Sequence, residues 1–228
     1  MAADGICSNK VDRSGVPSFR LYTWSGATVS LGYFQRETPE IEPNGDFAGL
    51  PAVRRLSGGG AILHHHELTY SCCVPAAHPY AEQPSLLYDR MHQRICDVFA
   101  EFGIVLGFRG ESEGAAKPFL CFSRGDRRDL VYRGFKVVGS AQRRRGRAVL
   151  QHGSILLRRS PFAPQFPGIF NLSEKDVDVA ALRQRLETHC GRLLGDSLRT
   201  DDLSAEELEA IRALRSERYL ANMPGHVS

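Results

Sequence analysis

The stretch RRLSGGGAILHHHELTYS, residues 54–71, places three consecutive glycines between two apolar segments. Residues 61–63 and 68–74 have the composition of strands, so Gly58, Gly59 and Gly60 are expected in a loop between them. A glycine run lets the backbone approach a ligand, and its amides can hold a carboxylate, a phosphate or a thioester carbonyl. No Gly-Lys-Ser/Thr follows, which excludes the phosphate loop of nucleotide-binding proteins. The motif predicts either a ligand-binding loop or a tight turn.

Three adjacent histidines, His64, His65 and His66, lie within the same motif. Adjacent residues on an extended chain point to alternate faces, so these imidazoles cannot all converge on one metal ion. The sequence nearby holds no second group of ligands with zinc spacing. We therefore expect no metal site.

The remaining pattern predicts an α+β domain that occupies the whole chain, 1–228. Apolar residues recur every three or four positions from Ser85 to Phe102, as in an amphipathic helix. A helical tail is expected over 176–228, with helices at 176–194 and 204–220. Ser204 and Glu207 form a capping box at the start of the last helix. Strands are expected at 19–24, 28–34 and 104–108, and in two hairpins that turn at Arg133-Gly134 and Arg145-Gly146. Strands thus come first and helices mainly late.

The composition is that of an ordinary globular protein, with 42% hydrophobic and 24% charged residues. No apolar run is long enough to span a membrane, and the N-terminus lacks the features of a secretory signal, so we expect a cytoplasmic protein without a membrane partner. A net charge of +3 is too small to require nucleic acid. The arginines at 143, 144, 145 and 147 form either a solvated turn or a docking patch for an acidic protein.

The six cysteines include no Cys-x-x-Cys pair, so neither disulfides nor a zinc knuckle are expected. Cys121 has a cationic neighbourhood, and positive charges favour the reactive thiolate form. These neighbours are Lys117, Arg124, Arg127 and Arg128. Cys72, Cys73, Cys96 and Cys190 lie in apolar strands or helices, as buried cysteines do, and Cys7 is expected in a mobile N-terminal tail. Cys121 is therefore the candidate nucleophile.

Two further segments, FKVVGSAQ (135–142) and LQHGSILL (150–157), carry small and polar residues on otherwise apolar strands. Lys136 is either an edge-strand charge or a functional one. The pair Gly139-Ser140 and the run His152-Gly153-Ser154 leave room and donors for a ligand. We expect these groups to share one surface of the hairpin.

These motifs, in this order, resemble the biotin/lipoate A/B protein ligase family. The matching segments are LYTWSGATVSLGYFQ (21–35), RRLSGGGAILHHHELTYS (54–71), FKVVGSAQRRRGRAVLQHGSILL (135–157) and SAEELEAIRALRSERY (204–219). The resemblance covers nearly the whole chain and implies the class II biotin/lipoate ligase-like catalytic domain, a mixed sheet with packing helices. The Cys-Phe pair ahead of KVVGSAQ is similar to that of octanoyltransferases of the glycine-cleavage H protein type.

The resemblance also implies a mechanism. Cys121 would take an octanoyl group from octanoyl-acyl carrier protein as a thioester, with Lys136 as its active-site partner. A lysine of a lipoyl-domain protein, the glycine-cleavage H protein or an E2 subunit, would then receive the group. No cofactor is implied, and ATP and magnesium would serve only a ligase. The expected substrate-binding residues are Arg55, Gly58, Gly59, Gly60, His64, Gly139, Ser140, Ala141, His152 and Gly153.

One departure and several alternatives accompany this hypothesis. Members of the family begin with a strand, followed by a helix that bears an Asn-Met-Ala-x-Asp-Glu-Ala motif. Met1–Asp4 resembles the middle of that motif, with Gly5 in place of the glutamate. The first strand is missing from this sequence. The start therefore lies upstream, or this member lacks an edge strand. The alternatives are an ATP-dependent lipoate ligase, which would need no cysteine, an amidotransferase between lipoyl domains, and a non-catalytic binding protein.

Overall fold

The computed structural model describes residues 2–36, 38–110, 120–123 and 125–214, which form two sheets. The larger sheet is antiparallel, with the order β1-β5-β9-β8-β7-β6. The smaller has the order β3-β2-β4, and its β2 and β3 run parallel. The strands are β1 (Ser18–Tyr22), β2 (Thr28–Leu31), β3 (Ala52–Arg54), β4 (Ile62–His64), β5 (Glu67–Val74), β6 (Gly107–Phe108), β7 (Leu130–Tyr132), β8 (Phe135–Arg145) and β9 (Ala148–Leu156).

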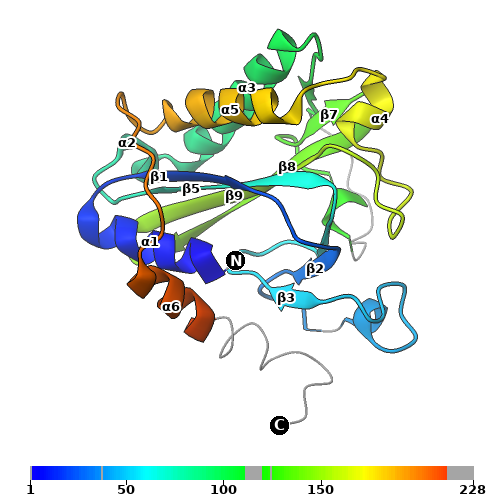
Figure 1. Ribbon diagram of the computed structural model, residues 1–228, viewed down its shortest axis with the longest axis horizontal. Helices are drawn as coiled ribbons and strands as arrows, with labels where there is room; N and C mark the ends of the chain where they lie inside the picture. Colours follow the sequence, from blue (N-terminus) through cyan, green and yellow to red (C-terminus); the bar gives the residue numbers. More distant parts are fainter. Residues whose placement is uncertain (1, 37, 111–119, 124, 215–228) are drawn as a thin grey trace.

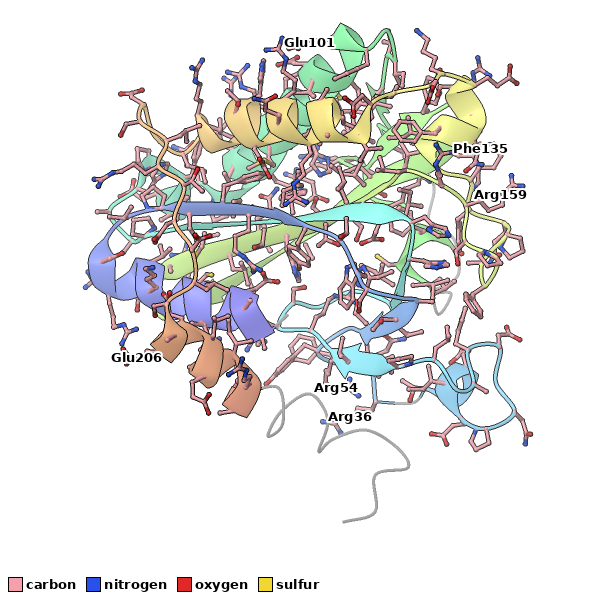
Figure 2. The ribbon with its side chains drawn as sticks, in the orientation of Figure 1. Arg36, Arg54, Glu101, Phe135, Arg159 and Glu206 are labelled. Atoms are coloured by element: carbon pink, nitrogen blue, oxygen red, sulfur yellow. The ribbon has the colours of Figure 1, made fainter. Side chains whose placement is uncertain are left out.

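Helices cover both faces of the six-stranded sheet (Figure 1). The helices are α1 (Ala2–Ser14), α2 (Pro79–Glu82), α3 (Pro84–Glu101), α4 (Ile169–Ser173), α5 (Val179–Gly191) and α6 (Ala205–Leu214), with 3-10 turns η1 (Pro39–Ile41) and η2 (Cys121–Ser123). Helices α3 and α5 lie on one face, and α1 and α6 on the other. Figure 2 shows Glu101 at the outer side of the α3 layer and Glu206 on the opposite side of the sheet. No helix in the described part of the chain is long and apolar enough to cross a bilayer.

Side chains alternate between the two faces of the sheet along β5, so the two faces have different compositions. Leu68, Tyr70, Cys72 and Val74 belong to the main core, which the apolar side of α3 completes. That side consists of Leu87, Met91, Ile95, Val98 and Phe99, all buried. Burying one such side chain contributes about 1.5–3 kcal/mol relative to leaving it in water. This face is therefore the main source of stability.

The opposite face of β5 carries Glu67, Thr69, Ser71 and Cys73. Cys73 packs with Val11 of α1 and with Ala148, while a separate apolar cluster lies under the smaller sheet. That cluster comprises Val29, Leu31, Phe47, Ala52, Ala61, Leu63, Leu120 and Ala163. The polar face of the large sheet is thus closed by α1 and by a second small core, which includes Leu120, the residue before Cys121.

Several predicted elements are confirmed. A mixed architecture of strands with packing helices is present. Arg133 and Gly134, with φ of 48° and 82°, form the turn between β7 and β8. The capping box at α6 is also present: Ser204 Oγ accepts a hydrogen bond from the Glu207 amide at 3.1 Å, and Glu207 Oε2 accepts one from the Ser204 amide at 2.8 Å.

The N-terminal prediction is wrong for Cys7, and helices are not mainly late. Residues 2–14 form α1, in which Cys7 is buried. The buried stripe of α1 includes Asp4, Ser8 and Val11, and its polar members hide the helical period from a hydrophobicity pattern.

Other predicted bounds differ from the structure. The expected strand at 104–108 is reduced to Gly107–Phe108, and the segments at 19–24 and 28–34 belong to different sheets. The expected end of the last helix, 215–220, lies outside the described residues.

Candidate active site

The Cys121 thiol lies against the glycine loop. Leu120 bridges Ala61 in parallel fashion, and the Cys121 amide donates to the Ala61 carbonyl at 2.6 Å. A Cβ placed on Gly59 would lie 3.9 Å from Cys121 Sγ, so the backbone of the loop forms one wall beside the sulfur. Of the six cysteines, all of them described, Cys121 is the one that is not buried. The structure therefore brings together the predicted nucleophile and the predicted glycine loop.

Lys136 approaches Cys121 from β8. Its Nζ lies 3.4 Å from the Cys121 carbonyl oxygen, 2.9 Å from Asp129 Oδ2 and 5.2 Å from the centre of the Phe122 ring. Burial raises the pKa of the Asp129 carboxyl, and the ammonium of Lys136 partly offsets that rise. The ion pair is almost fully buried, with side-chain exposures of 5% and 2%. Lys136 is thus a positive charge fixed beside the cysteine.

A glycine is required beside that lysine. A Cβ on Gly139 would lie 2.7 Å from Lys136 Cε, which is closer than side-chain atoms pack. The pairing of β8 with β7 is irregular here: Leu130 opposes Val138, whereas Val131 opposes Lys136. This β-bulge changes the direction in which the side chains of β8 point near Lys136.

Arg55 holds the glycine loop from behind. Its buried guanidinium donates to the carbonyls of Gly58 at 2.8 Å and Gly60 at 2.6 Å, and to Ser30 O at 2.9 Å. Because a trans peptide directs its carbonyl and amide in opposite directions, the Gly59 N–H points away from Arg55. Gly59 has φ of 96°, a region that favours glycine. Arg55 was expected to bind substrate. In the structure, its guanidinium instead donates hydrogen bonds to the carbonyls of the loop.

His64 is likewise buried rather than placed on the pocket. Its Nδ1 lies 2.6 Å from Glu67 Oε1, its Nε2 lies 2.7 Å from Ser30 Oγ, and the Trp24 ring stacks on it at 4.1 Å. Both ring nitrogens therefore have protein partners. The network joins the smaller sheet to β5. No group of three or more potential metal ligands occurs among the described residues.

His152 connects α1 to the start of the glycine loop. Its Nε2 contacts Ser57 Oγ, and its Nδ1 lies 3.8 Å from Asp4 Oδ2. Burial lowers the pKa of His152. Burial would raise the pKa of Asp4, but hydrogen bonding to His152 and the charge of Arg20 help to hold it well below its usual range. Sequence reasoning missed Asp4 and Ser57 as site residues, although both lie within motifs that it used.

The expectation that the hairpin groups share one surface is wrong. Gly139 pairs with Ser154, Ser140 with Gly153, and Ala141 with His152. Since neighbouring residues of a strand face opposite sides, Ser140 and Gly153 face the α3 layer, whereas Gly139, Ala141 and His152 face α1 and the site. Ser140 and Gly153 are thus behind the sheet, away from Cys121.

The arginine cluster is also divided between the two faces. Arg143 contacts the Leu56 carbonyl and stacks over the Tyr33 ring at 4.2 Å, whereas Arg144 donates to Ala81 O at 2.7 Å on the other side. Arg128, one of the cations expected near Cys121, instead pairs with Asp89 at 2.8 Å. Lys117 and Arg124 lie outside the described residues. Arg143 and Arg144 therefore lie on opposite faces of the sheet.

An apolar pocket opens next to Cys121. Both chain neighbours of the cysteine, Leu120 and Phe122, line it, as does Ala61 at the end of the glycine loop. The other lining residues are Ile62, Leu63, His65, His66, Leu156, Arg158, Ser160, Ala163 and Phe166. Apolar walls beside a half-buried thiol suit a hydrocarbon chain attached to that thiol.

A model of the lipoyl protein ligase A/B catalytic domain matches residues 1–188. The chain belongs to this family. Its relatives include the octanoyltransferase LipM of Staphylococcus aureus, 30% identical over 96% of this chain and 90% of that protein. The octanoyltransferase LipM of Carboxydothermus hydrogenoformans is 28% identical over the same shares of both chains.

Solved structures agree on the lipoyl protein ligase fold. Ta0514 of Thermoplasma acidophilum, described as a putative lipoate protein ligase, has a TM-score of 0.74 at 20% identity, over 96% of this chain and 89% of that one. A lipoate-protein ligase A bound with ATP has a TM-score of 0.72 at 20% identity, over 95% and 88%. The predicted fold class is confirmed.

Proposed function

We propose that this family member is an octanoyltransferase of lipoate biosynthesis that carries the acyl group on Cys121. The observation that carries the proposal is the position of Cys121: its sulfur lies beside the Gly59 backbone, and both of its chain neighbours, Leu120 and Phe122, line an apolar pocket. The octanoyltransferase relatives, which match nearly the whole chain, support the same chemistry. A thiol in this position can accept an acyl chain and hold its hydrocarbon part away from water.

The reaction consists of two acyl transfers. The Cys121 thiolate attacks the carbonyl carbon of the donor thioester, and the carrier thiolate leaves and takes up a proton. A lysine amine of the acceptor then attacks the Cys121 thioester, an amide bond forms, and Cys121 leaves as a thiolate while the amine loses its proton. Lys136 and the Gly59 amide are the groups that would stabilise the oxyanion in each step.

The proposed donor is octanoyl-acyl carrier protein and the proposed acceptor is a lipoyl-domain protein, either the glycine-cleavage H protein or an E2 subunit. Both steps exchange one acyl bond for another, so the chemistry consumes no ATP and needs no cofactor. The proposed location is the cytoplasm, where an acyl carrier protein would be available as donor.

The first experiment is an intact mass of the protein after incubation with octanoyl-acyl carrier protein and no acceptor. We expect one octanoyl adduct that hydroxylamine removes, since hydroxylamine cleaves thioesters. The Cys121→Ala variant should carry none, whereas the matched Cys96→Ala variant, which changes a buried cysteine, should carry it. An adduct on Cys121→Ala, or none on the wild type, would contradict the proposal.

A lipoate ligase is the second candidate, because solved ligases share the fold and one of them binds ATP. A ligase would modify the acceptor from free lipoate and ATP, and would tolerate Cys121→Ala. A protein that loads Cys121 only from an octanoylated lipoyl domain would instead be an amidotransferase. Offering the three donors separately distinguishes these activities.

A further inference from the structure

Ser140 lies at the centre of a buried polar network on the far side of the sheet from Cys121. Its Oγ lies 2.6 Å from the Tyr70 hydroxyl and 2.7 Å from His92 Nε2. Gln151 Nε2 donates to the Tyr70 hydroxyl at 2.7 Å, and His92 Nδ1 lies 2.6 Å from the Arg128 carbonyl. The four side chains come from β5, α3, β8 and β9, so the network is assembled by the tertiary fold.

The chemistry of the groups fixes the direction of every hydrogen bond. A carbonyl only accepts, so His92 Nδ1 carries a proton and donates it to Arg128 O. Burial lowers the pKa of His92 to about 4, so the ring is neutral and its Nε2 accepts from Ser140. Ser140 Oγ then accepts from Tyr70, whose oxygen accepts from Gln151. The chain of donors therefore ends on one backbone carbonyl.

That carbonyl belongs to the turn which carries the partner of Lys136. Asp129 follows Arg128, and its Oδ2 accepts both from the Asp126 amide at 2.7 Å and from Lys136 Nζ at 2.9 Å. The Arg128 side chain adds a second link to α3 through Asp89. Moving the Arg128 carbonyl would therefore move Asp129 and, with it, the ammonium beside Cys121.

The sheet leaves space for this network. A Cβ on Gly153 would overlap Ser140 Oγ and lie 2.6 Å from Tyr70 Cε1. The glycine at 153 thus allows the two hydroxyls to meet. His92 is fully buried in α3, and no part of it reaches the pocket.

We propose that His92 is a positioning residue for the active site, acting through the Arg128 carbonyl and Asp129 on Lys136. It holds the ammonium beside Cys121 without contacting substrate. The inference rests on the proposed function for its catalytic meaning, but its geometric content concerns the environment of the Cys121 thiol and can be measured without an acyl donor.

Two polar variants of His92 separate its two hydrogen bonds. In His92→Asn the amide nitrogen replaces Nδ1 and keeps a donor for Arg128 O. In His92→Gln the longer amide reaches the place of Nε2 and serves Ser140 instead. We measure the rate of Cys121 alkylation by iodoacetamide at neutral pH, with Cys121→Ala as the blank, and the rate of octanoyl loading from the carrier protein.

We expect His92→Gln to slow both rates by about tenfold and His92→Asn by no more than about threefold, because small displacements of a catalytic group are costly. In a Lys136→Met background the two His92 variants should differ by less than about twofold, since the residue they position is gone. Thermal melts of all variants report the purely structural cost.

Equal rates for the two variants in the presence of Lys136, or the same difference in its absence, would overturn the proposal. If the wild type is not loaded by the carrier protein but the alkylation rates follow the expected order, the proposed donor is wrong and the positioning role stands. If loading occurs and the variants do not differ, the positioning role is wrong and the proposed function stands.

Discussion

Replacing Lys136 with methionine should destabilise the protein in a pH-dependent way. The variant leaves the Asp129 carboxylate, 2% exposed, without its 2.9 Å ionic partner. Removing one partner of a buried pair typically costs about 3–5 kcal/mol, because the remaining charge stays desolvated. A domain of this size is stable by only about 5–15 kcal/mol, so the loss is large.

The sign of the pH dependence follows from Asp129. Its pKa is already raised by burial, and Lys136 opposes that rise, so the variant raises it further. A carboxyl with a raised pKa in the folded state binds its proton more tightly when folded. The penalty is therefore fully present above the folded pKa and disappears as the pH falls toward the unfolded value.

The assay is urea unfolding of wild type and variant at several pH values. We expect the difference in unfolding free energy to shrink by at least half between about pH 7.5 and pH 4.5. The double variant Lys136→Met/Asp129→Asn should recover most of the loss at neutral pH, because no unpaired charge remains at this position. Lys175→Met, which changes an exposed lysine, is the matched control. A loss that is constant with pH, or a double variant no better than the single one, would refute the reasoning.

Three further changes test the packing of the sheet, the pocket and the main core. Gly153→Ala should cost about 1–3 kcal/mol, because the new Cβ would lie 2.6 Å from Tyr70 Cε1; a thermal melt unchanged from wild type would contradict this. Phe166→Trp should shorten the apolar pocket and shift loading from octanoyl toward shorter chains, measured by competition between two acyl donors; an unchanged ratio would show that the chain lies elsewhere. Met91→Ala should cost about 2–5 kcal/mol in urea unfolding, whereas Leu86→Ala, at 37% exposure, should cost far less.

The sequence alone indicates Cys121 and Lys136, but it does not indicate the residues that position them. Cys121 and Lys136 could be chosen as candidate site residues because a cysteine in a loop with charged neighbours and a lysine on an apolar strand are locally unusual. Asp129 could not, since an aspartate in the polar run 123–129 is indistinguishable from a solvated one. Its role depends on a contact with a strand that returns seven residues later.

Face assignment is the second limit. The segments Gly139-Ser140 and His152-Gly153 suggested one polar surface, yet neighbouring residues of a strand face opposite sides, and the register between β8 and β9 places Ser140 with Gly153 on one side and His152 on the other. A strand of mixed small and polar residues gives no hydrophobic alternation to show which side is buried, so its faces are decided by pairing. The same argument applies to α1, whose buried face includes Asp4 and Ser8.

Two polar networks reach Cys121 from opposite sides of the large sheet. Arg55, linked through Ser30 to His64 and Glu67, holds the glycine loop; His92, through Arg128 and Asp129, leads to Lys136. The first network draws on the smaller sheet and β5, and the second on α3 and the β7–β8 hairpin. The Gly59 backbone and the Lys136 ammonium are therefore positioned by different elements, and both reach Cys121 only in the folded state. Because a developing oxyanion must lie near both at once, their relative position is set by the pairing of the sheet and not by any one contact. Polar residues on the α3 side of the sheet thereby affect the geometry around Cys121 on the other side.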